Sequence, residues 1–293
     1  MQVDRESLTG CCFNKSTISC NGQIIDLSHP VIMGIINLTP DSFYTQSRYN
    51  NEYDILRRTE AIITEGGTIV DIGACSTRPG SALISENEEL ERIFPAVASI
   101  RRHFPEIILS VDTFRSKVVK KIISETGECI INDISAGLLD PEMFETITEL
   151  QVPYILMHMQ GNPSDMQVKP EYKDVVTDII SFFNHNINIL QNRGLHDIII
   201  DPGFGFGKTT CHNFQLLNRL DTLRIFGLPV LAGLSRKSMI FKLLNCSPDE
   251  ALTGTIALNT IALLKGVNIL RVHDVKEATE IIQIVQKYYS CSE

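Results

Sequence analysis

Eight short runs rich in isoleucine and valine recur along the chain, separated by segments with helical patterning. The runs lack alternation between apolar and polar residues, which suits parallel strands buried on both faces. Strands that alternate with helices predict βαβ units and a parallel sheet. The runs span residues 31–36, 68–71, 107–111, 129–131, 154–157, 198–200, 229–232 and 267–270.

Helix signals fall between these runs. Capping patterns, in which a side-chain oxygen accepts from the first backbone N–H groups, mark four helix starts. They are Ser85 with Glu88 before a helix over 86–103, Asp140 with Pro141, Ser247 with Glu250, and Asp274 with Glu277. The segment 171–193 has helical spacing and ends in Arg193-Gly194, a C-terminal signal.

Eight such units without a leftover predict a (β/α)8 barrel, an α/β fold that typically needs about 250 residues. The chain has 293 residues, which fits that length. A doubly wound open sheet is the alternative. Residues 1–27 lie outside the pattern, and we expect a short N-terminal extension, a hairpin that covers the lower end of the barrel. Residues 28–293 would form the barrel domain.

Composition narrows the range of partners. The net charge of −9 and the pI of about 5.3 argue against a nucleic-acid surface. No apolar run approaches the ~18 residues of a membrane span. The eight cysteines are scattered without a C-x-x-C pair, so we expect no disulfide framework and a cytoplasmic location. A zinc site built from Cys11, Cys12, Cys20 and His29 would have the wrong spacing for a finger.

The glycine-rich stretch 198–210, "IIIDPGFGFGKTT", is similar to a phosphate-binding loop but fails the template. A P-loop ending in Gly207-Lys208-Thr209 needs glycine at the position that Pro202 occupies. The three glycines read G-x-G-x-G, which is not the dinucleotide spacing G-x-G-x-x-G. We interpret Lys208 as a loop or rim lysine, with the glycines bringing backbone close to a flat ligand.

Polar residues follow every predicted strand, where barrel active sites form. They are Asn37, Asp71, Asp112, Asn132 with Asp133, His158, Asp201, Ser235 with Arg236 and Lys237, and Arg271 with His273. Individually several have structural interpretations. Asp71 could brace the loop 72–81, Asp133 could cap a turn, and His158 could be a packed, hydrogen-bonded histidine.

Two groups of these residues suit two parts of a ligand. Arg271 and His273 are two apart, so both can face one way and form a cationic corner beside Asn37. That corner suits a diphosphate, with Asn37 as an oxygen ligand for Mg²⁺. The remaining group suits the 2-amino-4-oxo edge of a flat heterocycle such as a pterin or guanine. It consists of Asp112, Asn132, Asp201 and Lys237.

Eight sequence motifs surround these residues: "MGIINLTPDSF" (33–43), "STRPG" (76–80), "SVDT" (110–113), "INDIS" (131–135), "LMHMQGNP" (156–163), "DPGFGFGK" (201–208), "SRKSMI" (235–240) and "RVHDVKE" (271–277). In these motifs and in their order, the chain resembles the dihydropteroate synthases from about residue 28 to residue 285.

The resemblance implies a (β/α)8 homodimer that condenses (7,8-dihydropterin-6-yl)methyl diphosphate with 4-aminobenzoate in folate biosynthesis. Asp112, Asn132, Asp201 and Lys237 would bind the pterin, while Arg271, His273 and Thr77 would bind its diphosphate end and Asn37 would bind Mg²⁺. Arg78, Pro79, Phe206, Lys237 and Ser235 would line the aminobenzoate pocket, with Ser235 at a helix N-terminus. The catalytic groups would be Asp112, Lys237, Arg271 and His273.

The chemistry predicts an SN1-like reaction through a pterin methylene cation, with no enzyme nucleophile. Three stretches depart from the family pattern: Tyr44-Thr45-Gln46-Ser47, Ala74-Cys75 and Ala136. We also consider two alternatives, of which only the second is kept open by these departures. One is a methyltetrahydrofolate-dependent methyltransferase, which would not need the Arg271–His273 pair. The other is a non-catalytic pterin-binding paralogue.

Overall fold

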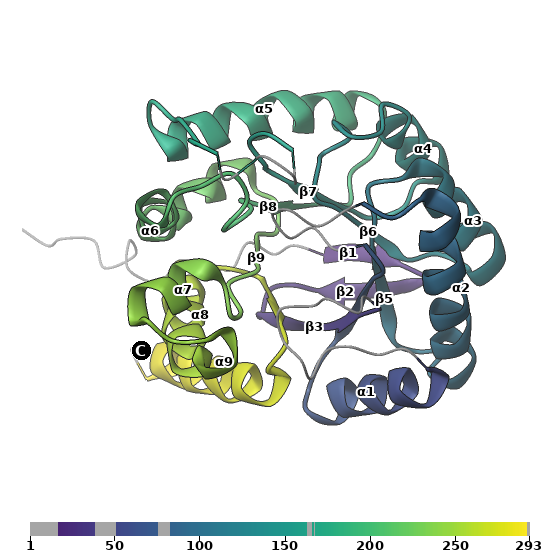
Figure 1. Cartoon of the computed structure of the whole chain (residues 1–293), viewed down its shortest axis with the longest axis horizontal. Coiled ribbons are helices and arrows are strands. Elements are labelled where there is room, and N and C mark those ends of the chain that lie inside the picture. The colour runs from purple at the N-terminus through teal and green to yellow at the C-terminus, as the bar shows by residue number, and fades with distance from the viewer. Residues whose placement is uncertain (1–16, 39–50, 76–82, 163–165, 167, 292–293) are drawn as a thin grey trace, which may run out of the picture.

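Eight parallel strands form a closed barrel with the helices as an outer ring (Figure 1). The computed structural model describes residues 17–38, 51–75, 83–162, 166 and 168–291. The strands pair in the order β8-β7-β6-β5-β4-β3-β10-β9, and a bridge between Ile200 and Val230 closes the ring. The predicted barrel is therefore confirmed, and the open-sheet alternative is wrong. The strands are β3 (Val31–Asn37), β4 (Ile69–Gly73), β5 (Ile108–Asp112), β6 (Ile130–Asp133), β7 (Tyr154–Met157), β8 (Ile198–Asp201), β9 (Leu231–Ala232) and β10 (Ile269–Val272).

The helices follow the strands in turn. They are α1 (Glu52–Thr64), α2 (Glu86–His103), α3 (Ser116–Thr126), α4 (Met143–Leu150), α5 (Val175–Asn192), α6 (Thr210–Asn218), α7 (Ser238–Leu244), α8 (Leu252–Leu264) and α9 (Val275–Ser290), with 3-10 turns η3 (Leu220–Phe226) and η4 (Pro248–Glu250). Ser85 caps α2 as predicted, accepting from Glu88 N. The capping box of Ser247 and Glu250 is present, but it caps the start of the 3-10 turn η4.

One predicted helix start is corrected, and another is confirmed without its side-chain cap. The helix after Asp140 begins only at Met143, because the Asp140 carboxylate accepts from Ser116 N and Glu142 N instead of capping it. Asp274 precedes α9 but makes no side-chain cap, since its carboxylate is bound by Arg236.

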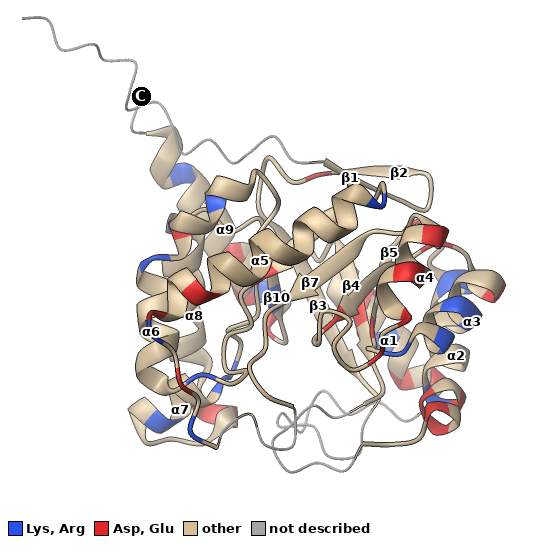
Figure 2. Cartoon of the chain, turned by 90° about the horizontal axis from the view of Figure 1, so that it is seen from above, with Lys and Arg blue, Asp and Glu red and all other residues tan. Residues whose placement is uncertain are grey.

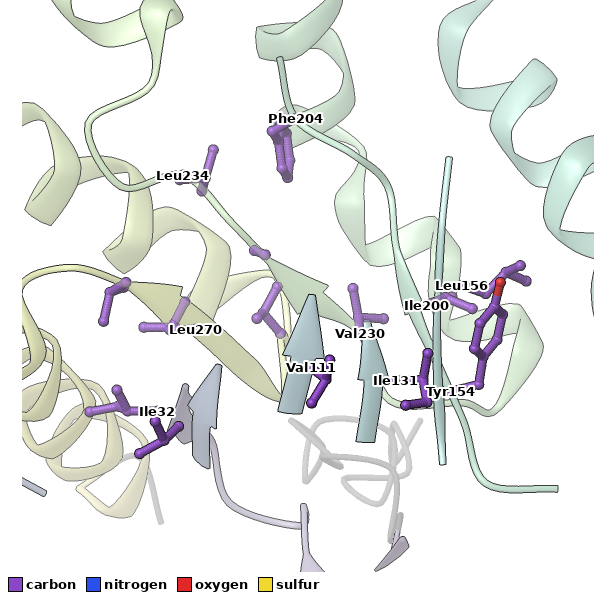
Figure 3. Packing of buried hydrophobic residues seen from close by; sticks show 14 of the residues in the cluster. Ile32, Val111, Ile131, Tyr154, Leu156, Ile200, Phe204, Val230, Leu234 and Leu270 are labelled. Carbon is purple, nitrogen blue, oxygen red and sulfur yellow. The ribbon is translucent and has the colours of Figure 1, made fainter. Parts of the chain in front are cut away.

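Side chains along a strand point alternately into the barrel and outward toward the helices, so each strand contributes to two separate cores. Outward-facing residues such as Ile32, Val111, Ile131 and Leu270 pack under the helices in one large apolar cluster (Figure 3). A Cβ on Gly34 would lie 2.7 Å from the side chain of Ile62 on α1, so glycine lets this helix approach closely. This cluster holds the ring of helices on the barrel.

Inward-facing residues at the amino ends of the strands form a second apolar cluster. Each strand supplies one residue: Met33, Ile69, Ile108, Ile130, Ile155, Ile199, Leu231 and Ile269. The hairpin of β1 (Thr17–Cys20) and β2 (Gln23–Asp26) lies across this end of the barrel and adds Ile18, Cys20, Ile25 and Leu27 (Figure 2). The predicted covering hairpin is confirmed. Cys20 is fully buried in it, which contradicts the zinc interpretation for that cysteine.

Acidic and basic residues are intermingled along the helices of the outer ring (Figure 2). Within the described residues, no helix has the length and apolar character of a membrane span. The six cysteines in this part of the chain are free thiols, and Cys11 and Cys12 lie outside it.

Candidate active site

The inward positions two residues after the lower apolar layer are largely polar. They include Asp71 on β4, Ser110 on β5, Asn132 on β6, Asp201 on β8 and Arg271 on β10. Each lies two positions after a residue of the lower apolar layer on the same strand. Its side chain therefore also faces the barrel interior, nearer the carboxyl end of the strand. We call these five side chains, together with Asp112, the upper polar layer.

Arg271 links two carboxylates across the barrel. Its Nε donates to Asp71 Oδ2 at 2.7 Å, and its Nη2 donates to Asp112 Oδ2 at 2.7 Å. Asp71 also accepts from Ser110 Oγ at 2.6 Å and from Asn132 Nδ2 at 3.3 Å. Asp71, Ser110, Asp112, Asn132 and Arg271 thus form a connected network in which one guanidinium is shared by two acids.

Asp71 therefore has a different role from the predicted one. It is fully buried and points into the barrel, so the interpretation that it braces loop 72–81 is wrong. The strand parity explains this, because Asp71 shares the inward face with Ile69. Asp71 orients Arg271 and Asn132, and through Arg271 it is coupled to Asp112.

The ionisation of Asp112 is set by competing effects. Burial raises the pKa of Asp112 to about 7, the charge of Arg271 opposes this rise, and the neighbouring Asp71 carboxylate reinforces it. The side chain keeps 17% of its exposure, in contrast to Asp71 at 0%. Asp112 is consequently the acid of this pair that can reach a ligand in the barrel mouth.

Asp201 and Lys237 form the facing part of the site. Asp201 accepts from Gly203 N at 2.7 Å, which fixes its carboxylate at the end of β8. Lys237 Nζ donates to the carbonyl of Phe204 and lies 4.3 Å from the centre of the Phe206 ring. Burial lowers the pKa of Lys237 to about 8, although Asp201 opposes this change. The structure thus brings Lys237 and Phe206 together, as the pocket assignment requires.

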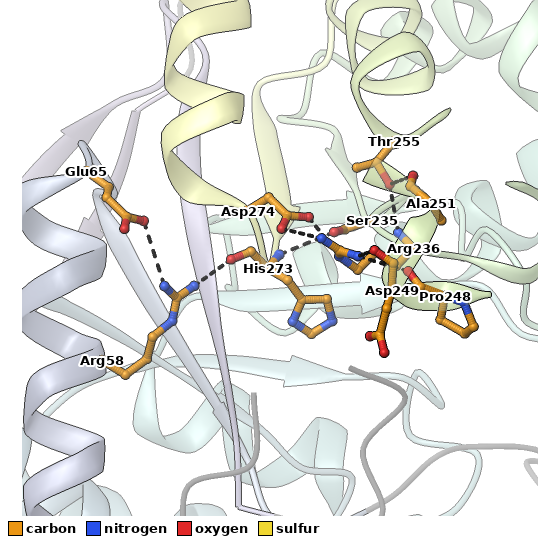
Figure 4. Close-up of polar contacts among 10 residues, drawn as sticks. All are labelled: Arg58, Glu65, Ser235, Arg236, Pro248, Asp249, Ala251, Thr255, His273 and Asp274. Carbon is orange, nitrogen blue, oxygen red and sulfur yellow. Dashed lines mark hydrogen bonds and ion pairs between the residues drawn. The ribbon is translucent and has the colours of Figure 1, made fainter. Parts of the chain in front are cut away.

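His273 lies between two arginine-centred clusters (Figure 4). Arg58 Nη2 donates to its carbonyl at 2.6 Å, and its N–H donates to Ser235 Oγ at 3.3 Å. Burial lowers the pKa of His273 to about 3, and the charges of Arg271 and Arg58 act in the same direction. The predicted cationic corner is therefore corrected: His273 is neutral, and Arg271 is already paired with acids.

Ser235 and Arg236 also differ from the sequence interpretation. Helix α7 begins at Ser238, so Ser235 is not at a helix N-terminus. Arg236 points away to bind the Asp274 carboxylate through Nε and Nη2, and the carbonyls of Pro248 and Asp249 through Nη1 (Figure 4). Arg236 thus anchors the loop that carries Lys237.

The glycines at positions 203 and 207 let their loop lie close to the backbone of His158 and Gln160. A Cβ on Gly203 would overlap the carbonyl oxygen of His158, and one on Gly207 would overlap that of Gln160. Both have positive φ, at +68° and +62°. The expectation that all three glycines approach a flat ligand is therefore wrong for these two.

Three further residues have settled local roles. Asp133 is buried and accepts from Ser135 N, Gly137 N and Tyr154 Oη, which confirms a turn-capping role. Ala136 in that turn has φ +53°, the left-handed region that favours glycine. His158 is buried and lies edge-to-face on Phe182, as a packed histidine should.

Sequence reasoning did not single out the apolar wall at the upper end of the barrel. Phe114, Ile134, Met157, Met159 and Met166 form this cluster, and Cys75 and Phe206 pack against it. The available signal was that Met157 lies two positions after Ile155 on β7, so both side chains face inward. Such a wall provides apolar surface for a flat ring beside the upper polar layer.

Some predicted residues lie outside the described residues. They are Thr77, Arg78 and Pro79, and the unusual stretch Tyr44-Thr45-Gln46-Ser47. Of the other departures, Ala74 is fully buried at the end of β4, and Cys75 packs on the apolar wall.

The donor set fits a magnesium ion that relies on substrate oxygens. Asn37 ends β3 at the barrel mouth and is partly exposed. The described residues contain no group of three His, Cys, Asp or Glu side chains that could hold a metal ion. Mg²⁺ usually keeps several waters and binds one or two protein ligands plus phosphate oxygens, so a single amide oxygen suits it.

Comparisons with known proteins identify the family. The family model described as "Pterin binding enzyme" matches residues 33–273. Dihydropteroate synthase of Escherichia coli (strain K12) is 44% identical over 93% of this chain and 96% of its own length. That of Haemophilus influenzae is 42% identical over 91% of this chain and 96% of its own.

Solved structures give the same result. A Yersinia pestis dihydropteroate synthase in complex with a sulfonamide drug has a TM-score of 0.90 and 42% identity, covering 94% of this chain and 100% of its own. A Xanthomonas albilineans dihydropteroate synthase with 4-aminobenzoic acid has a TM-score of 0.83 and 36% identity, covering 93% and 97%. The chain therefore belongs to the pterin binding enzymes and, within them, to the dihydropteroate synthases.

Proposed function

We propose that the chain condenses (7,8-dihydropterin-6-yl)methyl diphosphate with 4-aminobenzoate to give 7,8-dihydropteroate and diphosphate. The observation that carries this proposal is the upper polar layer with its adjacent apolar wall. Carboxylates, an amide and an ammonium group surround a space that suits the 2-amino-4-oxo edge of a pterin. Relatives named dihydropteroate synthase support the same assignment.

Asp201 and Asn132 would hold the amino edge of the pterin, and Lys237 would donate to its carbonyl side. Asp112 would accept from a ring N–H. Because Arg271 already donates to Asp112, a pterin and Arg271 would share that carboxylate. Binding of the pterin and of its diphosphate end are therefore coupled through one residue.

The reaction needs no enzyme nucleophile. The bond between the pterin methylene carbon and the diphosphate oxygen breaks, and the diphosphate leaves with the electron pair. The amine nitrogen of 4-aminobenzoate then forms the new C–N bond and releases a proton to solvent. The Asp112 carboxylate would stabilise the methylene cation, and Arg271 would stabilise the departing diphosphate.

His273 would act on the diphosphate as a hydrogen-bond donor, since its low pKa in the ligand-free protein leaves its ring neutral with one N–H. Asn37 would bind Mg²⁺, which supplies positive charge to the leaving group when bound. Phe206 and Ser235 would line the aminobenzoate side of the pocket, together with Arg78 and Pro79.

We also propose the homodimer and the cytoplasmic location expected from the sequence. Exposed apolar side chains on α7 and α8 supply a surface for self-association: Leu243, Leu244, Ile261 and Leu264. Sedimentation of the purified chain would test the dimer, and a single species of monomer mass would contradict it.

The direct test of the function is an assay with pterin diphosphate, Mg²⁺ and 4-aminobenzoate that follows diphosphate release. We expect release that requires all three components and stops on addition of a chelator. Folded protein that binds pterin but releases no diphosphate would instead support a non-catalytic pterin-binding role.

A further inference from the structure

Lys208 is a buried lysine that the proposed reaction leaves unused. Only 2% of it is exposed, so it is neither a rim residue nor a phosphate ligand, and the interpretation as a rim lysine is wrong. Its Nζ lies 3.0 Å from His158 Nδ1, 2.9 Å from Gly203 O and 3.0 Å from Phe206 O. An ammonium group has three N–H donors, which these three acceptors match.

The three acceptors belong to two neighbouring strand ends. His158 follows β7, whereas Gly203 and Phe206 belong to the loop after β8. The N–H of Gly203 in turn donates to the Asp201 carboxylate, so the backbone of one glycine links Lys208 to the pterin-binding acid. Asn213 of α6 holds the same loop by accepting from Gly205 N and donating to Lys208 O.

We propose that Lys208 is a positioning residue of the pterin subsite: it fixes the loop 203–206 against the end of β7 and keeps a positive charge behind Asp201. The inference rests on the proposed function, because Asp201 is there the acceptor for the pterin amino edge. The same loop carries Phe206 and the carbonyl that binds Lys237, so Lys208 also sets the aminobenzoate side.

The electrostatics of the loop agree with this geometry. Burial raises the pKa of Asp201, and the charges of Lys237, Arg271 and Lys208 lower it. Burial lowers the pKa of Lys208 well below its ordinary value and Lys237 adds to this, whereas the Asp201 charge and the three acceptors around Nζ favour the ammonium form. Burial, and then the charge of Lys208, lower the pKa of His158 well below its ordinary value, so its ring stays neutral and Nδ1 can accept.

The test compares pterin binding by neutral variants at this position over a range of pH. Lys208→Met keeps the length of the side chain but removes the charge and all three donors, whereas Lys208→Gln keeps two N–H donors. Lys173→Met is the matched control, because Lys173 is exposed on the preceding βα-loop. The probe is 6-hydroxymethylpterin, followed by calorimetry between pH 5 and 8, so no turnover is needed.

We expect both Lys208 variants to lose about tenfold in affinity at pH 7.5. We also expect the pH below which affinity falls to rise by about one unit, since Asp201 loses a neighbouring charge. Lys173→Met should match the wild type. If Lys208→Met is not recovered folded, Lys208→Gln carries the same prediction. Unchanged affinity, or an equal loss at every pH, would overturn the proposal.

The variant His158→Phe distinguishes the effect of the Lys208 charge from the effect of its contact with His158. This variant keeps the ammonium group and removes one acceptor, so affinity should fall a few-fold without a change in the pH dependence. A pH shift as large as that of Lys208→Met would contradict the assigned role of the charge. Failure of the wild type to bind the pterin at any pH would instead refute the proposed function itself.

Discussion

The two ends of the barrel interior are built from the same strands and have opposite chemistry. At the amino end, eight apolar residues and a hairpin pack together as a buried cluster. Two residues further along, about 7 Å by strand geometry, the same face carries Asp71, Ser110, Asn132, Asp201 and Arg271. The change occurs within single strands, as from Ile69 to Asp71 on β4.

The difference teaches how a barrel can hold charge in its interior. The lower layer is stabilised by burial alone, so any well-packed apolar residue of similar size would serve there. The upper layer depends on pairing among its members, with Arg271 between two acids. The lower end should therefore contribute to stability alone, whereas the upper end should also determine ligand binding and turnover.

The largest expected effect comes from removing the shared cation. Arg271→Met should reduce turnover by about 10²- to 10³-fold. It should also lower the free energy of unfolding by about 3 kcal/mol, because Asp71 and Asp112 lose their partner. Urea denaturation and steady-state kinetics measure the two effects.

A second substitution tests the cause of that instability. Adding Asp71→Asn to Arg271→Met removes the unpaired buried carboxylate, so stability should largely return while turnover stays low. If the double variant is no more stable than the single one, the ion pairs are not what holds the upper polar layer.

The pH dependence should also originate at the upper end. Below about pH 7 protonation of Asp112 removes the charge that stabilises the cation, and above about pH 8 Lys237 loses its proton. We therefore expect kcat/KM for the pterin diphosphate to be greatest between these values. A flat profile from pH 6 to 9 would show that neither group titrates in the reaction.

The smallest expected effect concerns a strained residue beside the site. Ala136 has φ +53°, so Ala136→Gly should relieve strain and raise the free energy of unfolding by about 0.5 to 1 kcal/mol. Kinetic constants should not change, because the turn is held by Asp133 and lies outside the polar network. A lower stability would show that the left-handed turn is not strained by alanine.

The fold was predictable because periodicity and strand count carry the information for a barrel. All eight apolar runs became strands, and the hairpin covers the end where it was expected. The polar residues at the strand ends were also identified. Their pairing was not, because Asp71 and Arg271 are 200 residues apart and meet only when the ring closes.

The charge states of individual side chains could not be predicted from the sequence either. His273 was expected to be cationic, but burial between Arg58 and Arg271 makes it neutral. Lys208 was expected to be a loop or rim lysine, and it lies in the loop, but its side chain is buried. In both cases burial in the folded chain decides the chemistry, and residue type alone does not show it.

The most direct measurement uses two substitutions on one strand. Ile130 and Asn132 both face the barrel interior from β6, in the lower and the upper layer respectively. Pterin affinity and urea denaturation should be measured for Ile130→Ala and Asn132→Ala.

We predict that Ile130→Ala loses about 3 kcal/mol of stability with pterin affinity within about twofold of the wild type. Asn132→Ala should lose about tenfold or more in affinity and only about 1 kcal/mol of stability. Equal losses of affinity in the two variants, or a loss confined to Ile130→Ala, would contradict the division of the barrel into a structural and a binding end.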